Sequence, residues 1–299
     1  MNKRLKFGVN LMYTDKNGNK WYKGNLHTHT TISDGRLDIK ESIALYKENG
    51  YDFIAITDHW KWNFLAFDMG ITVIPGCEYD FGSICGRDIY HIVAIDCKVE
   101  PRIERTYTPQ EAIDAIHSCG GICNLAHPAW SLNSPEDLIK LKNVDMTEIF
   151  NSVSDVPGNC RPYSGVIVDT MAARGHMWNL CATDDTHFYG EADSCRSFVY
   201  VNSTSEKREH IVNAIKEGKY YASQGPQISV EIKNDKVIVE TTPVCQIVFY
   251  TGKAYVKDRC VVGDDITCGE YTIKKDDRFV RVEVKDKDGK FAWSQYYKL

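Results

Sequence analysis

Short apolar runs alternate with segments of helical character over most of the first 225 residues. Six of these runs read as buried strands, at 53–56, 72–74, 89–95, 122–126, 146–150 and 180–183. Strands that are apolar on both faces are typical of a parallel sheet covered by helices. About seven such strand–helix units favour a closed barrel over an open sheet. The predicted fold class is therefore α/β, a distorted barrel of the (β/α)7 type.

The segments between the strands carry helix start and stop signals. Asp38 and Glu41 have the spacing of a capping box, and Gly50 follows as a stop signal. Further helices are expected at 108–120, 161–174 and 205–218, with a short one near 135. No Gly-x-Gly-x-x-Gly follows the first strand and no Gly-Lys-Ser/Thr loop occurs, so the sequence disfavours nucleotide-cofactor folds.

The pattern changes after Gln224-Gly225-Pro226. Short alternating runs at 228–232, 237–239, 247–250 and 280–284 are separated by turn residues such as Asn234-Asp235 and predict a small antiparallel, sandwich-like β-domain. We therefore divide the chain into an N-terminal β lead-in (1–21), a hydrolase domain (22–225) and a C-terminal β-domain (226–299).

Metal-binding residue types collect where the predicted strands end. An extended His27-Thr-His29 puts both imidazoles on one side of a strand, and imidazole is a common ligand for transition metals. Barrel enzymes build their sites at the carboxyl ends of strands. Those ends carry His27, His29, His59, Glu78, His127, Asp185 and His187, and the first loop adds Asp34. His91 departs from the rule because it lies near the start of its run, so its strand is expected to be short or antiparallel.

These motifs together resemble the PHP superfamily, named for polymerase and histidinol phosphatase domains. The resemblance rests on Asn-Leu-His27-Thr-His29 with Ser33-Asp34-Gly35, Ile-Thr-Asp58-His59, Pro-Gly-Cys-Glu78 with Tyr-His91-Ile-Val, Asn-Leu-Ala-His127-Pro and Ala-Thr-Asp184-Asp185-Thr-His187. It covers roughly residues 22–225 and fills all nine expected ligand positions. The segment that begins at Ala292 also resembles the end of a β-domain found behind some members.

The resemblance implies up to three divalent metal ions. His27, His29, Glu78 and Asp185 would hold the first ion, Asp34, His59 and His187 the second, and Glu78, His91 and His127 the third. Independently of the resemblance, six imidazoles with three carboxylates favour zinc, manganese or iron over magnesium or calcium.

Catalytic roles follow from such a cluster. Asp185 and His187 are expected to take part in catalysis as ligands, while Asp184 is the weaker ligand candidate. Asp58 is either a general acid or, as we favour, a residue that orients a ligand histidine. Phosphate-binding candidates near strand ends are Lys61, Arg87, Asn151 and Arg161, with a solvated surface charge as the alternative for each cation.

The leading function is hydrolysis of a small phosphorylated metabolite, such as a nucleotide, an amino-alcohol phosphate or a sugar phosphate, by a metal-activated hydroxide. The alternatives are a nuclease for short oligonucleotides and a non-catalytic metal-containing binding module. The net charge of −5 gives no basic footprint, which disfavours binding of long nucleic acids.

The same sequence suggests where the protein works. No signal-like segment and no 18-residue apolar run occurs, and the eleven cysteines show no disulfide framework. We therefore expect a cytoplasmic protein with reduced thiols that does not insert into a membrane. The oligomeric state does not follow from the sequence.

Overall fold

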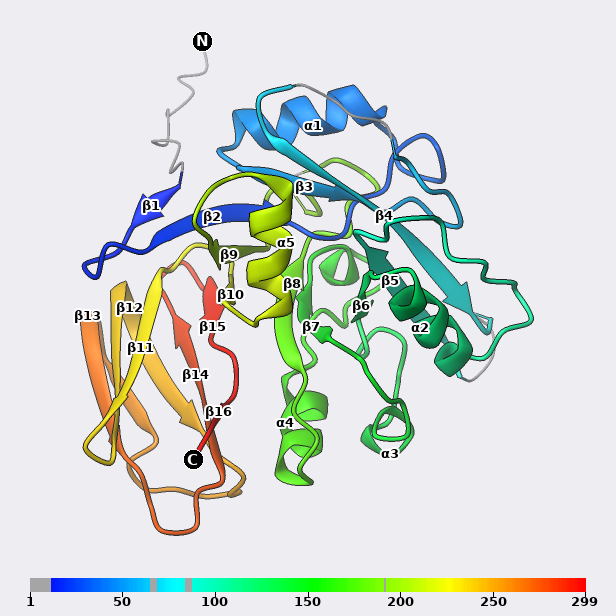
Figure 1. Cartoon of the computed structure of the whole chain (residues 1–299). Helices are drawn as coiled ribbons and strands as arrows, with labels where there is room; N and C mark the ends of the chain where they lie inside the picture. The colour runs from blue at the N-terminus through cyan, green and yellow to red at the C-terminus, as the bar shows by residue number, and fades with distance from the viewer. Residues whose placement is uncertain (1–11, 65–68, 84–87, 191) are drawn as a thin grey trace.

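The computed structural model describes residues 12–64, 69–83, 88–190 and 192–299, which form a mixed α/β fold with one large sheet and few helices (Figure 1). The strands are β1 (Tyr13–Thr14), β2 (Lys20–Asn25), β3 (Phe53–Ile56), β4 (Thr72–Phe81), β5 (Tyr90–Ile95), β6 (Ile122–Leu125), β7 (Met146–Asn151), β8 (Asn179–Thr183), β9 (Phe198–Asn202), β10 (Tyr220–Ser223), β11 (Ile228–Lys233), β12 (Lys236–Tyr250), β13 (Cys260–Thr272), β14 (Phe279–Lys285), β15 (Phe291–Trp293) and β16 (Tyr297–Lys298). The helices are α1 (Ile39–Glu48), α2 (Pro109–Ser118), α3 (Pro135–Leu138), α4 (Gly165–Ala173) and α5 (Arg208–Lys216), with a 3-10 turn η1 (Val153–Asp155).

Strands β2 to β8 follow one another in the sheet in chain order. Pairing is parallel along β2-β3-β4 and along β6-β7-β8, and antiparallel on both sides of β5. The segments that follow β2 and β8 meet in a parallel bridge between Thr28 and Thr186. The ends of distant strands are thereby brought to one place.

The expected one-to-one alternation of strands and helices is wrong at β4. This strand does not end at Glu78 but continues to Phe81 and pairs with β5 as an antiparallel hairpin. The strand continues because successive side chains alternate between its two faces. Cys77, Tyr79 and Phe81 are buried in one apolar cluster, and Glu78 lies on the opposite face. The antiparallel alternative for the His91 strand is confirmed.

The predicted helix signals are confirmed at α1. Asp38 accepts a hydrogen bond from the Glu41 amide at 2.9 Å, and the Glu41 carboxylate accepts one from the Asp38 amide at 3.1 Å. The capping box satisfies two amides at the helix start. Ile43 and Tyr46 of this helix are buried in the same apolar cluster as Phe249 and other residues of the last strands.

Two strands absent from the sequence prediction, β9 and β10, connect the two parts of the sheet. β9 pairs with β2, β10 pairs with β9, and β15 pairs with β10. From β15 the hydrogen-bonded sheet continues through β14 and β12 to β11. It therefore crosses the domain boundary predicted near residue 225, and that boundary stays a prediction. Figure 1 shows β11 to β14 side by side at the lower left.

The C-terminal strands are antiparallel, as expected, and the predicted turn lies at Asn234 and Asp235, whose φ angles are +50° and +59°. The long strand β13 was not predicted. None of the helices in the described part of the chain is long and apolar enough to cross a lipid bilayer.

Candidate metal centre

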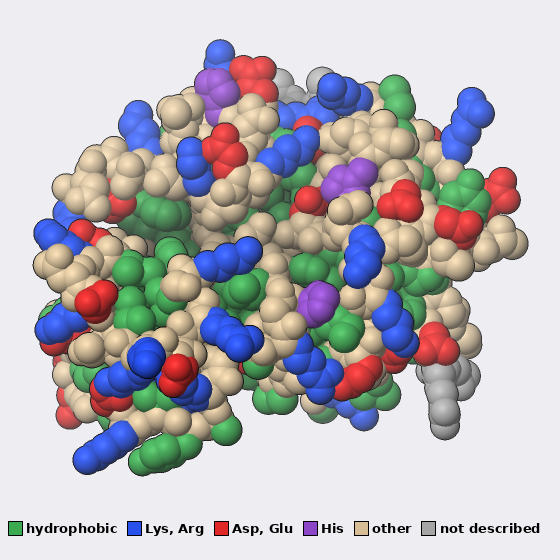
Figure 2. All heavy atoms as spheres, turned by 60° about the horizontal axis from the view of Figure 1, so that its bottom comes forward, with side chains coloured by type: hydrophobic (Ala, Val, Ile, Leu, Met, Phe, Trp, Pro, Cys, Tyr) green, Lys and Arg blue, Asp and Glu red, His purple; other side chains and the backbone are tan. Residues whose placement is uncertain are grey.

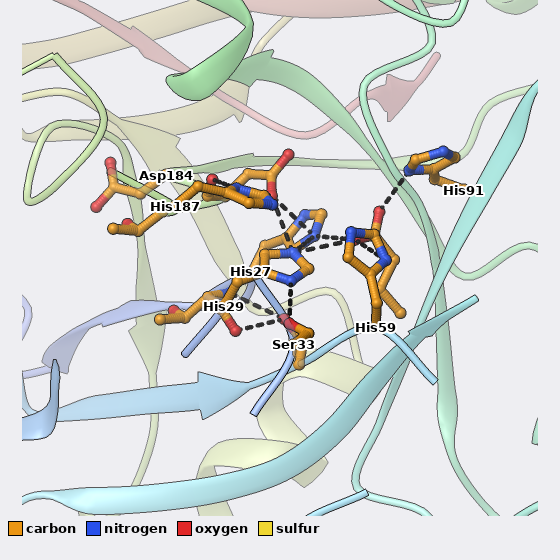
Figure 3. A network of polar contacts seen from close by, with 12 residues as sticks. His27, His29, Ser33, His59, His91, Asp184 and His187 are labelled. Atoms are coloured by element: carbon orange, nitrogen blue, oxygen red, sulfur yellow. Dashed lines mark hydrogen bonds and ion pairs between the residues drawn. The ribbon is translucent and has the colours of Figure 1, made fainter. Parts of the chain in front are cut away.

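The segment after β2 places two histidines in the interior. The His29 amide donates to the Thr186 carbonyl at 3.1 Å, and the Asp185 amide donates to the His27 carbonyl at 3.0 Å. This extended pairing turns both imidazoles to the same side, where neither is exposed. Figure 3 shows the imidazoles of His27, His29 and His59 gathered together, with His91 reaching in from another strand.

A first group consists of four buried side chains, His27, His29, Glu78 and Asp185. Their facing atoms are His27 Nε2, His29 Nε2, Glu78 Oε2 and Asp185 Oδ1. The two Nε2 atoms lie 3.1 Å apart, and each lies 3.0–3.2 Å from both carboxylate oxygens. Ligands about 2.0–2.2 Å from a tetrahedral zinc ion are themselves separated by about 3.3–3.6 Å. The four atoms therefore converge with nearly the spacing that one ion requires.

Unsatisfied polar atoms support this fit. Asp185 Oδ1 and His59 Nδ1 are buried and have no hydrogen-bond partner. A buried polar atom without a partner costs free energy unless an ion or water occupies the space in front of it. Both atoms belong to residues that line the same cavity.

A second group lies nearer the surface and contains His29, Asp34, His59 and His187. Asp34 Oδ1 is 3.5 Å from His187 Nε2, and Asp34 Oδ2 is 3.8 Å from His59 Nε2. His29 contributes its Nδ1 atom to the second group, 3.5 Å from Asp34 Oδ1. Its Nε2 atom faces the first group. The remaining three residues are those that the resemblance implies for the second ion.

A third group joins Glu78 to His91 and His127. Glu78 Oε1 is 2.9 Å from His91 Nδ1 and 3.5 Å from His127 Nε2, whereas Oε2 faces the first group. The two oxygens of one carboxylate thus point to different groups. Glu78 occupies a position from which it could bridge two ions.

The electrostatics keep the carboxylates ionised. Burial by itself raises the pKa of Glu78, but the charges of His27, His59 and His91 outweigh it and hold the pKa well below its usual range. For Asp185, burial is likewise outweighed, mainly by His27 and His29, and its pKa is also lowered. Ionised carboxylates are the form that binds a cation.

Asp58 is fully buried beneath the first loop. Its carboxylate accepts hydrogen bonds from the amide and hydroxyl groups of both Thr30 and Ser33, at 2.7–3.2 Å. It therefore fixes the loop that carries His29 and Asp34. No hydrogen bond to a histidine is found for Asp58 among the described residues, so any orienting effect acts through this loop.

The sequence prediction missed Glu148, which lies inside β7 and is not exposed. It accepts hydrogen bonds from His27 Nδ1 at 2.8 Å and the His127 amide at 2.9 Å. Asn124 and Asn151 donate their side-chain amides to the same carboxylate at 3.1 and 2.7 Å. Glu148 thus supports residues of two groups. A single carboxylate within a buried apolar strand is the signal that could have revealed it, because such a charge must be paired.

Asp184 and Asp193 hold the loop around His187. Asp184 lies outside all three groups and accepts the amides of Cys195, Arg196 and Ser197 at 2.7–3.0 Å. Burial raises the pKa of Asp184 to about 6. Asp193, which was not predicted, accepts the amides of His187 and Phe188 at 2.9 and 2.6 Å.

A cavity of about 220 Å³ opens above the three groups. Besides ligand candidates it is lined by Trp130, Val153, Ser154, Asn159 and Phe188. Apart from the ligand candidates, the lining thus combines apolar side chains with the polar side chains of Ser154 and Asn159.

The predicted phosphate-binding residues lie elsewhere or outside the described residues. Lys61 and Arg161 are exposed and do not line the cavity, and Arg87 lies outside the described residues. Asn151 is fully buried, and its amide nitrogen donates to Glu148 and to Asp185 Oδ2 at 3.1 Å. Its amide oxygen accepts from Ser154, so Asn151 supports the carboxylates from below.

Comparison with known proteins gives similarity at the level of structure. No protein-family profile matches the sequence, and no curated protein matches it. A two-domain protein from Bacteroides vulgatus that contains a predicted PHP-like metal-dependent phosphoesterase has a TM-score of 0.56 and 16% identity, over 99% of this chain and 99% of that chain.

Two further structures are less similar. A protein from Bifidobacterium adolescentis, described as a candidate metal-dependent phosphoesterase, has a TM-score of 0.44 and 15% identity, over 65% of this chain and 94% of that one. A lesion-specific endonuclease from Pyrococcus furiosus has a TM-score of 0.45 and 16% identity, over 66% of this chain and 56% of that one. The whole-chain similarity carries the conclusion: this chain shares its overall fold with the two-domain protein from Bacteroides vulgatus.

Proposed function

We propose that the protein is a metal-dependent hydrolase of phosphoric esters, with a small phosphorylated metabolite as its substrate. The observation that carries the proposal is the position of Glu78, whose Oε2 faces His27 and His29 while Oε1 faces His91 and His127. A buried carboxylate divided in this way suits a cluster of cations rather than a single salt bridge. The proposed architecture is a distorted PHP barrel followed by a β-domain.

The proposed ligands are the nine residues of the three groups: His27, His29, Asp34, His59, Glu78, His91, His127, Asp185 and His187. Their nitrogen-rich donor set suits zinc, manganese or iron. When bound, such ions lower the pKa of a water molecule and neutralise charge on phosphoryl oxygens. The protein itself supplies fixed positions, since Asp58 holds the first loop and Glu148 holds His27 and His127.

The cavity supports a small substrate. Its volume of about 220 Å³ accommodates a phosphoryl group with only part of an organic moiety. Basic and acidic side chains are interspersed over the face shown in Figure 2. The net charge of −5 does not favour binding of a long polyanion. Cytoplasmic placement is part of the proposal, and turnover on different esters decides between a monoesterase and a diesterase.

The test is a turnover screen on a panel of phosphorylated metabolites, with short oligonucleotides included. The metal content of the same sample is measured in parallel. We expect release of phosphate or a phosphomonoester after loading with zinc, manganese or iron. Asp185→Asn should abolish turnover, whereas Asp114→Asn, an exposed carboxylate on α2, should not. A metal-loaded protein without turnover on any ester would instead support a binding module, and a metal-free protein would overturn the proposal.

A further inference from the structure

The mouth of the cavity carries a cationic side chain that the sequence prediction did not single out. The guanidinium of Arg36 lies over the ring of Phe188, with its central carbon 5.0 Å from the ring centroid. Phe188 lines the cavity and is 46% exposed, so the pair borders the opening rather than the core. Among the described residues, no carboxylate lies within ion-pair distance of Arg36.

The backbone fixes this pair relative to the metal centre. Arg36 follows Asp34 by two residues, and Phe188 directly follows His187. The Arg36 amide donates to the His187 carbonyl at 2.9 Å, which joins the two loops. A Cβ on the intervening Gly35 would lie 2.3 Å from the His29 carbonyl oxygen, so the loop closes tightly only with glycine. Arg36 is therefore held at a defined edge of the cavity.

The charge of Arg36 is not needed at the scissile phosphoryl group. Three divalent ions would carry six positive charges against the three carboxylates of Asp34, Glu78 and Asp185. No lysine or arginine among the described residues lines the cavity itself. A cation at the mouth therefore faces the part of a substrate that extends beyond the cavity. Arginine stacked on an aromatic ring keeps its planar donors available for a phosphate or carboxylate.

We propose that Arg36 and Phe188 form a specificity site for a second anionic group, so that the substrates are phosphoric esters whose organic part carries a further phosphate or carboxylate. The inference rests on the proposed function and names its substrate class. The small cavity agrees with it, because an organic part that extends past Phe188 comes close to Arg36.

The test uses phosphonates, whose carbon–phosphorus bond is not hydrolysed, so that binding is measured apart from turnover. Calorimetry on the manganese-loaded full chain compares methylphosphonate with two series of increasing length, ω-carboxyalkylphosphonates and alkane-α,ω-diphosphonates. We expect the best member of one series to bind about tenfold more tightly than methylphosphonate. The series that contains it distinguishes a carboxylate from a phosphate as the second group.

Arg36→Gln should abolish this preference, and Arg36→Lys should restore only part of it, because lysine keeps the charge without the planar fork. Lys40→Gln removes the same charge from an exposed position on α1 and should keep the full preference. Equal binding of all ligands by the wild type, or a preference that survives in Arg36→Gln, would overturn the inference alone. A loaded protein that binds no phosphonate would overturn the proposed function as well.

Discussion

At the scale of single residues, the candidate metal ligands are held by carboxylates that lie behind them, and Glu148 is one of these. His27, His29 and Asp185 could be recognised in the sequence because histidines and carboxylates seldom cluster after predicted strands, and the ends of such strands converge. Glu148 was missed, since its role depends on His27, which is distant along the chain, and on donors from β6 and β7. Contacts between strands distant in sequence are not readable from local pattern.

Glu148→Gln should weaken metal binding by about 10–100-fold, as is typical for partners of ligand histidines. Four donors converge on this carboxylate, and an amide would turn its own NH2 group toward some of them. Competition with a chelating indicator measures the effect, and Glu48→Gln at the exposed end of α1 is the control. Unchanged affinity would show that His27 does not need this partner.

Asp58 allows the two proposed roles to be separated. As a residue that positions the first loop, Asp58→Asn should lower kcat by less than about tenfold, because an amide can still bond Thr30 and Ser33, while Asp58→Ala should cost much more. If Asp58 is instead a general acid, kcat should fall by about 100-fold or more in both variants. The pH profile of kcat for Asp58→Asn provides the second measurement, since a positioning role leaves its basic limb unchanged.

At the scale of elements, the sequence predicted well where a local signal sets the boundary. α1 and α2 begin at their capping boxes, and β3 occupies the predicted residues. β13 could not be predicted because Asp264 and Asp265 interrupt its pattern and most of it is exposed. Its pairing with β12 determines its conformation. The extension of β4 past Glu78 was missed because a ligand position was taken as a strand end.

The first loop gives a prediction at this scale. Gly35→Ala should destabilise the protein by about 1–3 kcal/mol, since the new methyl group would meet the His29 carbonyl oxygen at 2.3 Å. It should also weaken binding of the ion assigned to Asp34. Gly190→Ala has open space at its Cβ and should change the free energy of unfolding by less than about 0.5 kcal/mol. Urea denaturation measures both, and equal effects would contradict the close approach.

At the scale of the whole molecule, a buried ion-pair network joins the last strands to α4. Arg281 on β14 donates to both carboxylate oxygens of Asp169, at 3.0 and 2.7 Å, and to Glu283 at 3.0 Å. Tyr163 and Tyr296 donate to the same carboxylates. The sequence predicted two domains but not this junction, because an arginine within an alternating strand reads as a solvent-facing residue.

Arg281→Met should lower the free energy of unfolding by about 3–5 kcal/mol, because it leaves two largely buried carboxylates without their cation. Arg278→Met, at the exposed position directly before β14, should have little effect. Chemical denaturation of both variants measures the difference. Equal midpoints would mean that the junction contributes no net stability.

Trp293 links the C-terminal strands to the candidate metal centre. This fully buried side chain of β15 stacks on Phe150 at 5.8 Å, and Phe150 immediately precedes Asn151, which donates to Glu148 and Asp185. A residue of the C-terminal segment thus packs beneath side chains that come from much earlier in the sequence. We expect a proteolytic cut ahead of Phe291 to release bound ions even though every ligand remains on the larger fragment.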